Sequence, residues 1–118
     1  MQLTVEERGQ VRIVRVKEAK MTYPGLSSFF GAVRALVEGG TRRLVLDLQA
    51  VSYVDSATIG CLLDIHRLLQ EQSGSLKLAA LQSRVETMLS MTGVHKIIAL
   101  YRSEEEALAA FDDGAARA

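Results

Sequence analysis

The chain has 118 residues, enough for one domain, and its 14 Lys and Arg residues balance 14 Asp and Glu residues. This balance, without a clustered basic stripe, argues against binding to nucleic acid. The one cysteine, Cys61, cannot form an intrachain disulfide, and no apolar run approaches the ~20 residues of a membrane span. Residues 1–7 also lack the features of a signal peptide, so we expect a soluble cytoplasmic protein with no membrane partner.

The first third of the chain predicts a hairpin followed by a helix. Residues 3–6 and 11–16 alternate in polarity and flank a turn signal at Gly9, which is typical of an antiparallel hairpin. Residues 18–25 contain the only proline and predict a loop. Apolar residues then recur at helical spacing from Leu26 to Val37, and the predicted helix stops at two glycines.

The centre of the chain predicts a buried strand and a long helix. Residues 43–48 form a nearly continuous apolar run, residues 49–54 a connection, and residues 56–71 a helix. Apolar residues cover more than half of this helix. That is wider than packing on one sheet face requires, so its margin contacts either a partner or a neighbouring helix.

The last third predicts two further strand–helix units. Strands are expected at 75–81 and 96–101, with a short helix between them that starts at Ser83 and closes near Gly93, and another helix after the second strand. Ser83 and Glu86 match a capping box, as do Ser103 and Glu106. Three residues are expected to pack the last helix onto the sheet: Ala107, Leu108 and Phe111. Residues 112–118 are expected to fray.

The predicted order of elements is β-β-α-β-α-β-α-β-α. It favours a single α/β domain over residues 1–111, with a mixed, mostly parallel sheet, an N-terminal β-hairpin and about four α-helices. Loops that follow parallel strands gather at one end of the sheet, where ligands and partners bind. We therefore expect Ser56 at the start of the second helix, beside the segment 21–25.

Ser56 could serve as a helix cap, a nucleophile or a phosphate acceptor. A hydrolase elbow needs G-x-S-x-G, and no glycine flanks Ser56. His66 lies roughly 15 Å further along the same helix, too far to be a base for Ser56. We expect His66 to be packed and hydrogen-bonded, and His95 to lie on the surface at a strand start.

The sequence also lacks the residues that other kinds of catalytic site require. Asp47 ends a central strand, but residues 11–16 carry no carboxylate and Glu18 alone is not the acidic pair that Mg²⁺ needs, so we expect Asp47 to bond local backbone or a neighbouring side chain. One cysteine and two distant histidines make no metal site, and no phosphate-binding glycine motif is present. Cys61 is expected to be buried and structural. The sequence predicts no cofactor and no esterase, phosphatase or ATPase activity.

Two segments together resemble the signature of the STAS domains of bacterial anti-sigma-factor antagonists. They are residues 44–48 and the run Val54-Asp55-Ser56-Ala57-Thr58-Ile59-Gly60, in which an Asp-Ser pair precedes small residues and a glycine. The resemblance extends over nearly the whole chain. Thr58 departs from it, because the family commonly has glycine there. The family's frequent Gly-x-hydrophobic-Asp loop after the second strand is also absent from residues 17–21.

The resemblance implies a non-enzymatic switch. Such antagonists bind a serine/threonine kinase that is also an anti-sigma factor; the kinase ends binding by phosphorylating a serine, and a phosphatase resets it. That serine corresponds to Ser56, with Thr58 as a second candidate acceptor. The implied partner-binding residues are Met21, Thr22, Tyr23, Tyr53, Asp55, Ser56, Ala57, Thr58, Ile59 and Gly60. Two alternatives stay open: Ser56 as an unmodified cap, and a scaffold or subunit of a signalling or transport assembly without a working phosphosite.

Overall fold

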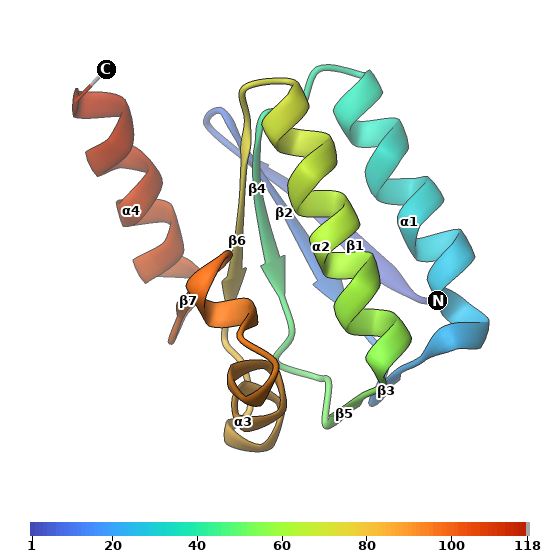
Figure 1. The fold of residues 1–118 in the computed structure, drawn as a ribbon. Helices are drawn as coiled ribbons and strands as arrows, with labels where there is room; N and C mark the ends of the chain where they lie inside the picture. The colour runs from blue at the N-terminus through green and yellow to red at the C-terminus, as the bar shows by residue number, and fades with distance from the viewer. Residues whose placement is uncertain (118) are drawn as a thin grey trace.

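The computed structural model describes residues 1–117, with side-chain surroundings as far as residue 112. The elements, shown in Figure 1, are β1 (Leu3–Arg8), β2 (Val11–Val16), β3 (Lys20–Met21), α1 (Tyr23–Glu38), β4 (Arg43–Asp47), β5 (Tyr53–Val54), α2 (Ser56–Glu71), β6 (Ser75–Ala79), α3 (Ser83–Met91), the 3₁₀ helix η1 (Val94–Lys96), β7 (Ala99–Tyr101) and α4 (Glu104–Arg117).

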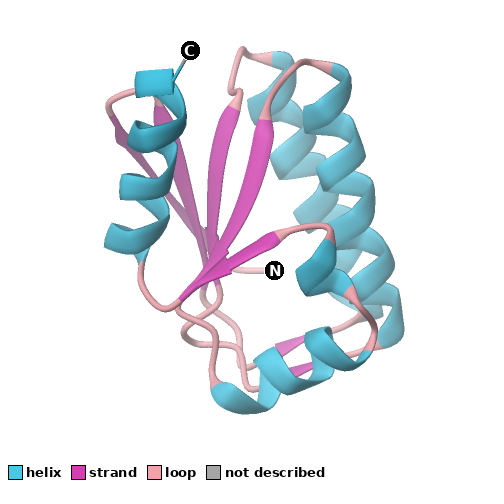
Figure 2. Ribbon diagram, turned by 60° about the vertical axis from the view of Figure 1, so that its left-hand side comes forward, coloured by secondary structure: helices cyan, strands magenta, loops and turns pink. Residues whose placement is uncertain are grey.

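The main sheet has five strands in the order β1-β2-β4-β6-β7. β1 pairs antiparallel with β2, and the other neighbours are parallel. The mixed sheet, its N-terminal hairpin and the four α-helices confirm the predicted fold class. α1 and α2 cover one face of the sheet, while α4 lies on the other (Figures 1 and 2).

The alternation of side chains along the strands divides the core into two layers. In β2, Val14 and Val16 point into the large cluster under α1 and α2, whereas Val11 and Ile13 point into a smaller cluster under α4. Ala107 and Phe111 complete the smaller cluster, and Leu108 packs against it, as predicted for the last helix. Two layers explain why the central strands read as continuous apolar runs.

The segments predicted as loops beside Ser56 contain regular structure that the sequence did not reveal. β3 and β5 pair as a separate two-stranded parallel sheet, with Met21 opposite Val54. Two residues are too few to show a periodic pattern. α1 also begins at Tyr23 rather than at Leu26, because a proline is compatible with the first turn of a helix, where its missing N–H is not needed.

The C-terminal half departs from prediction in three places. The capping box at Ser83 does not form, because the N-cap of α3 is Gln82 and it makes no side-chain cap bond. His95 lies in η1 rather than at a strand start, and the strand is the shorter β7. The second box forms in part: Ser103 Oγ accepts from the Glu106 N–H at 3.1 Å, but the Glu106 carboxylate accepts from Arg102 N–H instead of Ser103.

α4 continues to Arg117, residue 118 lies outside the described residues, and fraying of residues 112–118 stays a prediction.

Candidate functional site

The candidate site forms where β3 and β5 bring two distant segments together. Pairing of Lys20 with Tyr53 and of Met21 with Val54 places the start of α1 beside the start of α2 (Figure 1). Ser56 is the first residue of α2. This arrangement confirms the expectation that Ser56 begins the second helix next to the segment 21–25.

Asp55 is the N-cap of α2, so the alternative in which Ser56 is the cap is wrong. Asp55 Oδ1 accepts from the Thr58 N–H at 2.9 Å, and Oδ2 accepts from the Tyr23 N–H, also at 2.9 Å. Burial raises the pKa of Asp55, but the hydrogen bonds from Tyr23 and Thr58 outweigh it and hold the pKa below its usual value. The carboxylate is therefore charged at neutral pH and joins the first turns of two helices.

Ser56 is exposed, and its hydroxyl makes no hydrogen bond to the described residues. It stands in the first turn of a 16-residue helix, where backbone N–H groups lack intrahelical acceptors and the helix dipole favours negative charge. Because Asp55 supplies the cap, the Ser56 hydroxyl is not needed to hold the helix. The position can accept a phosphate without losing a structural bond.

Thr58 and Met21 are both fully buried, which corrects their assignment to a partner-contacting surface. The Thr58 hydroxyl lies 2.5 Å from the Met21 carbonyl oxygen and 2.8 Å from Asp55 Oδ1, and it can donate its one proton to either. A kinase cannot reach this hydroxyl in the folded chain. The threonine that departs from the STAS pattern thus links α2 to β3.

A shallow groove runs between α1 and α2 beside Ser56. Its lining combines Tyr23, Pro24, Leu26, Ser27 and Phe30 of α1 with Ala57, Gly60, Cys61 and Asp64 of α2. Tyr23 is 73% exposed, and Tyr53, in the strand β5 that precedes α2, is 38% exposed. The wide apolar arc of α2 is mostly buried. Leu62, Ile65 and Leu69 lie in the core, Ile59, Leu63 and Leu68 pack against it, and Cys61 lines the groove.

Cys61, which lines this groove, is predicted to react slowly with thiol-modifying reagents. Burial, and then the charge of Asp64, raise the pKa of its thiol to about 11, so little thiolate exists at neutral pH. Alkylation by iodoacetamide at pH 7.5 should be at least tenfold slower in the folded protein than in urea, as followed by intact mass. Equal rates in the two states would contradict the burial.

Neither histidine forms a hydrogen bond with Ser56 among the described residues. His66 is half-buried in α2, but its buried Nδ1 has no hydrogen-bond partner among the described residues, so the expected hydrogen bond is wrong at that atom. His95 is exposed, as predicted. Among the side chains described, as far as residue 112, no three His, Cys, Asp or Glu residues are grouped to hold a metal ion. In the described part of the chain, no helix combines the length and the apolar character that a membrane span requires.

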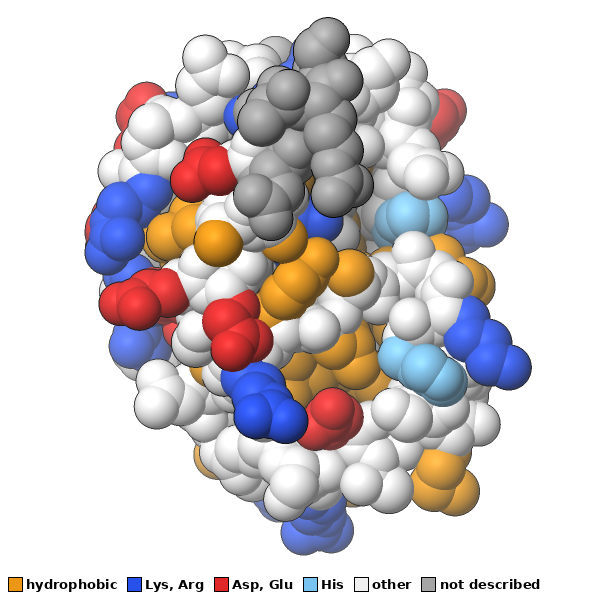
Figure 3. Space-filling view, turned by 90° about the vertical axis from the view of Figure 1, so that its left-hand side faces the viewer, with side chains coloured by type: hydrophobic (Ala, Val, Ile, Leu, Met, Phe, Trp, Pro, Cys, Tyr) orange, Lys and Arg blue, Asp and Glu red, His pale blue; other side chains and the backbone are white. Residues whose placement is uncertain are grey.

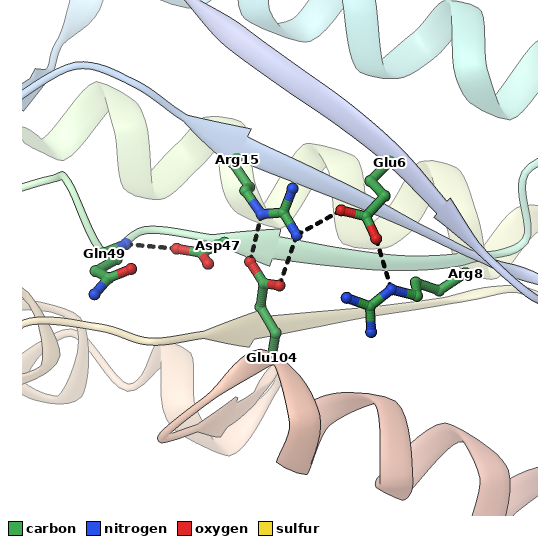
Figure 4. A network of polar contacts seen from close by, with 6 residues as sticks. All are labelled: Glu6, Arg8, Arg15, Asp47, Gln49 and Glu104. Atoms are coloured by element: carbon green, nitrogen blue, oxygen red, sulfur yellow. Dashed lines mark hydrogen bonds and ion pairs between the residues drawn. The ribbon is translucent and has the colours of Figure 1, made fainter.

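A polar network that the sequence did not reveal lies on the other side of the sheet, under the start of α4 (Figure 4). Arg15 donates two hydrogen bonds to Glu104, at 2.7 and 2.8 Å, and contacts Glu6 at 2.9 Å. Asp47 accepts from the Gln49 N–H at 2.7 Å, which confirms its predicted local bond. Arg15 and Glu104 are 89 residues apart, so their pairing leaves no local sequence signal.

The network divides its charge unequally between the two central carboxyl groups. Burial, followed by a side-chain hydrogen bond with Glu104, raises the pKa of Asp47 to about 6. The bidentate bond from Arg15 and the bond with Asp47 lower the pKa of Glu104 to about 2. Arg15 donates two hydrogen bonds to the Glu104 carboxylate and so stabilises its charged form. A proton shared by Glu104 and Asp47 therefore resides on Asp47.

The face of the molecule that carries α4 is mixed in charge. Figure 3 shows Lys and Arg side chains interspersed with Asp and Glu around a patch of apolar side chains, rather than a continuous basic band. Beside β7, a small and largely polar pocket is lined by Leu81, Glu86, Leu100, Tyr101, Arg102 and Glu106.

Several known proteins are similar to this chain. BtrV of Bordetella bronchiseptica, described as a candidate anti-sigma factor antagonist, is 35% identical over 77 residues, which span 65% of this chain and 66% of BtrV. An anti-sigma F factor antagonist of Paenibacillus polymyxa is 29% identical over 65 residues, spanning 55% and 56% of the two chains. These alignments thus cover less than two thirds of either relative.

Solved structures share the fold over a larger part of the chain. The crystal structure of an anti-sigma factor antagonist from Mycobacterium paratuberculosis is 25% identical and covers 92% of each chain with a TM-score of 0.83. Unphosphorylated SpoIIAA is 16% identical, covers 95% of this chain and 97% of its own, and has a TM-score of 0.81. The profile of the STAS domain matches residues 2–107, so this chain belongs to the STAS domain family.

Proposed function

We propose that this chain is a phosphorylation-controlled protein-binding switch that sequesters an anti-sigma-factor serine/threonine kinase. The proposal is supported by its membership of the STAS family and by relatives named anti-sigma factor antagonists. The proposal depends most on one observation: the hydroxyl of Ser56 is exposed in the first turn of α2, and Asp55 rather than Ser56 caps that helix.

Ser56 is the proposed phosphate acceptor. It is exposed, whereas the second candidate, Thr58, is fully buried and bonded to the backbone of β3. A Bacillus protein of the same fold, SpoIIAA, has been solved in both an unphosphorylated and a phosphorylated form. In our proposal the partner kinase adds the phosphate to Ser56, the complex dissociates, and a phosphatase restores the binding form.

The proposed partner surface surrounds Ser56 on exposed and half-buried residues of both helices and of β5. It consists of Thr22, Tyr23, Tyr53, Asp55, Ser56, Ala57, Ile59 and Gly60. Exposed tyrosines beside small residues provide apolar contact area with a polar atom at its edge, a combination that is common in protein interfaces. Met21 and Thr58 support this surface from below.

The decisive experiment is intact mass spectrometry of protein purified from its native host, with and without phosphatase treatment. We expect one phosphatase-sensitive phosphate on the wild type and none on Ser56→Ala. Ser83→Ala is the matched control, because Ser83 is also an exposed first residue of a helix, α3. Undiminished phosphate on Ser56→Ala would exclude Ser56 as the acceptor. If the protein from its host carries no phosphate at all, the switch is refuted and a scaffold is favoured.

A further inference from the structure

Asp55 connects the phosphoacceptor turn to a second helix. Thr58, which donates to Asp55 Oδ1, belongs to α2, and Tyr23, which donates to Oδ2, is the first residue of α1. The N-cap residue of α1, Thr22, makes no side-chain cap bond. Asp55 therefore supplies to α1, from 32 residues away, the bond that a cap residue ordinarily supplies.

The bond to Tyr23 sets one wall of the groove between α1 and α2. Tyr23 is 73% exposed and lines the groove at the end nearest Ser56, opposite Ala57 and Gly60 of α2. The preceding strand, β3, is only two residues long and ends at Met21. Tyr23 lies just beyond that short strand, and the Asp55 carboxylate accepts its backbone N–H.

We propose that Asp55 is a positioning residue through which a phosphate on Ser56 acts on α1: the phosphate weakens the bond between Asp55 and the Tyr23 N–H and loosens the Tyr23 end of the groove. The inference rests on the proposed function in taking Ser56 as the phosphate-bearing residue. A phosphate on Ser56 would obstruct the partner directly. The inference adds that the phosphate also changes the start of α1, at Tyr23.

The physical reason lies in like charge at adjacent residues. Asp55 is ionised, and its hydrogen bonds hold its pKa low. A phosphoserine next to it brings about −1.5 to −2 charges at pH 7, so the carboxylate must turn away or take up a proton. Either response weakens the carboxylate as an acceptor for the Tyr23 N–H. The phosphate can itself accept N–H groups of the α2 first turn, so α2 loses little.

The remaining contacts localise the effect to α1. If Asp55 withdraws, the Thr58 hydroxyl can still donate its proton to the Met21 carbonyl oxygen, and β3 stays paired with β5. Thr58 and Met21 are fully buried, so they keep α2 and β3 together. The predicted change is therefore greatest at Tyr23 and small in the rest of the site.

The test uses the protein alone, with phosphoserine incorporated at position 56 during synthesis. The readout is the exchange of the Tyr23 amide proton with water, measured by NMR and expressed relative to the rate in an unstructured peptide. We expect the phosphate at Ser56 to speed this exchange at least fivefold and to raise the pKa of Asp55, followed by its carboxyl ¹³C shift. The acceleration should grow as the phosphate takes its second charge near pH 6.

Two controls separate this coupling from general loosening. Phosphoserine at Ser83, the exposed first residue of α3, follows the neutral Gln82 and should change Tyr23 exchange less than twofold. In Asp55→Asn the neutral amide is not repelled, so phosphate at Ser56 should also act less than twofold. Asp55→Ser, another neutral N-cap, takes its place if the asparagine disturbs the fold.

The outcomes distinguish this inference from the proposed function. Unchanged Tyr23 exchange on phosphorylation at Ser56, an equal acceleration from Ser83, or a full acceleration in Asp55→Asn would each overturn the coupling while leaving kinase binding untouched. If the protein from its host carries no phosphate, the switch is refuted, but the effect of the incorporated phosphate on Tyr23 still stands or falls by these measurements.

Discussion

Replacing Ser56 with Asp is expected to weaken binding of the partner kinase at least tenfold, about 1.4 kcal/mol, in calorimetric titration. The free energy of unfolding should stay within about 1 kcal/mol of the wild type, because Ser56 is exposed and the helix start tolerates an anion. Ser56→Ala should keep wild-type affinity, since its hydroxyl makes no bond to the described residues.

The charge beside Asp55 explains why binding and not folding should suffer. A phosphate of −1.5 to −2 charges about 6 Å from that carboxylate would meet a repulsion of roughly 4–6 kcal/mol at an effective dielectric of 20, before salt screening. In the free protein the exposed phosphate can point into the solvent, away from Asp55. A partner packed over this turn of α2 prevents that movement and must also remove water from the charged phosphate.

Ser83→Asp provides the matched control for this measurement, because it adds the same charge at the first residue of α3 and should leave affinity unchanged. Equal affinities for the wild type and Ser56→Asp would remove Ser56 from the binding mechanism.

Replacing Asp47 with Asn is expected to stabilise the protein by about 1–2 kcal/mol more at pH 7.5 than at pH 5. The Asn amide can donate to Glu104 at every pH while its oxygen still accepts from the Gln49 N–H. The wild-type carboxyl group can do both only when it is protonated. Urea unfolding at the two pH values measures the difference.

The sign follows from the direction of each pKa. The pKa of Asp47 is raised from 3.8 to about 6 in the folded state, so its contribution to stability is fully present below pH 3.8 and is lost as the pH rises through 6. A rise from 3.8 to about 6 corresponds to a loss of about 3 kcal/mol in all, because one pKa unit corresponds to about 1.4 kcal/mol, and about half of that loss falls between pH 5 and 7.5. The pKa of Glu104 is lowered to about 2, so its contribution is present above pH 4.5 and is lost on further acidification. Between pH 5 and 7.5 the change therefore comes from Asp47.

Asp64→Asn is the control for the Asp47 measurement. Asp64 is an exposed carboxylate of α2 that pairs with Arg67, so its replacement should leave the wild-type pH dependence intact. If Asp47→Asn keeps the same loss of stability between pH 5 and 7.5 as the wild type, the assignment of the shared proton to Asp47 is wrong.

Local pattern was sufficient to predict most of the architecture. The alternation in residues 11–16, the apolar run at 43–48 and the helical spacing from Leu26 to Val37 each reflect a side-chain period that regular structure imposes. The order of elements then limited the sheet to a mixed, mostly parallel one. Because Ser56 follows a central strand, the same order also placed it at the binding end of that sheet.

Local sequence patterns predicted helix starts and very short strands least reliably. A serine at the start of a helix can be its cap or its first residue, and at both Ser56 and Ser83 it is the first residue. The residue before each serine takes the cap position, Asp55 with its side chain and Gln82 without. Such one-residue shifts depend on local packing, which sequence spacing does not express.

The sequence by itself determined the fold class, the STAS signature and the place of Ser56 at the start of α2, because each depends on local periodicity or on the order of elements. Only the tertiary structure decided that Thr58 is buried, that Asp55 caps two helices, and that Arg15 holds Glu104 beside Asp47. These contacts join residues from separate elements, and their energies depend on distance and burial in three dimensions, which no local pattern records.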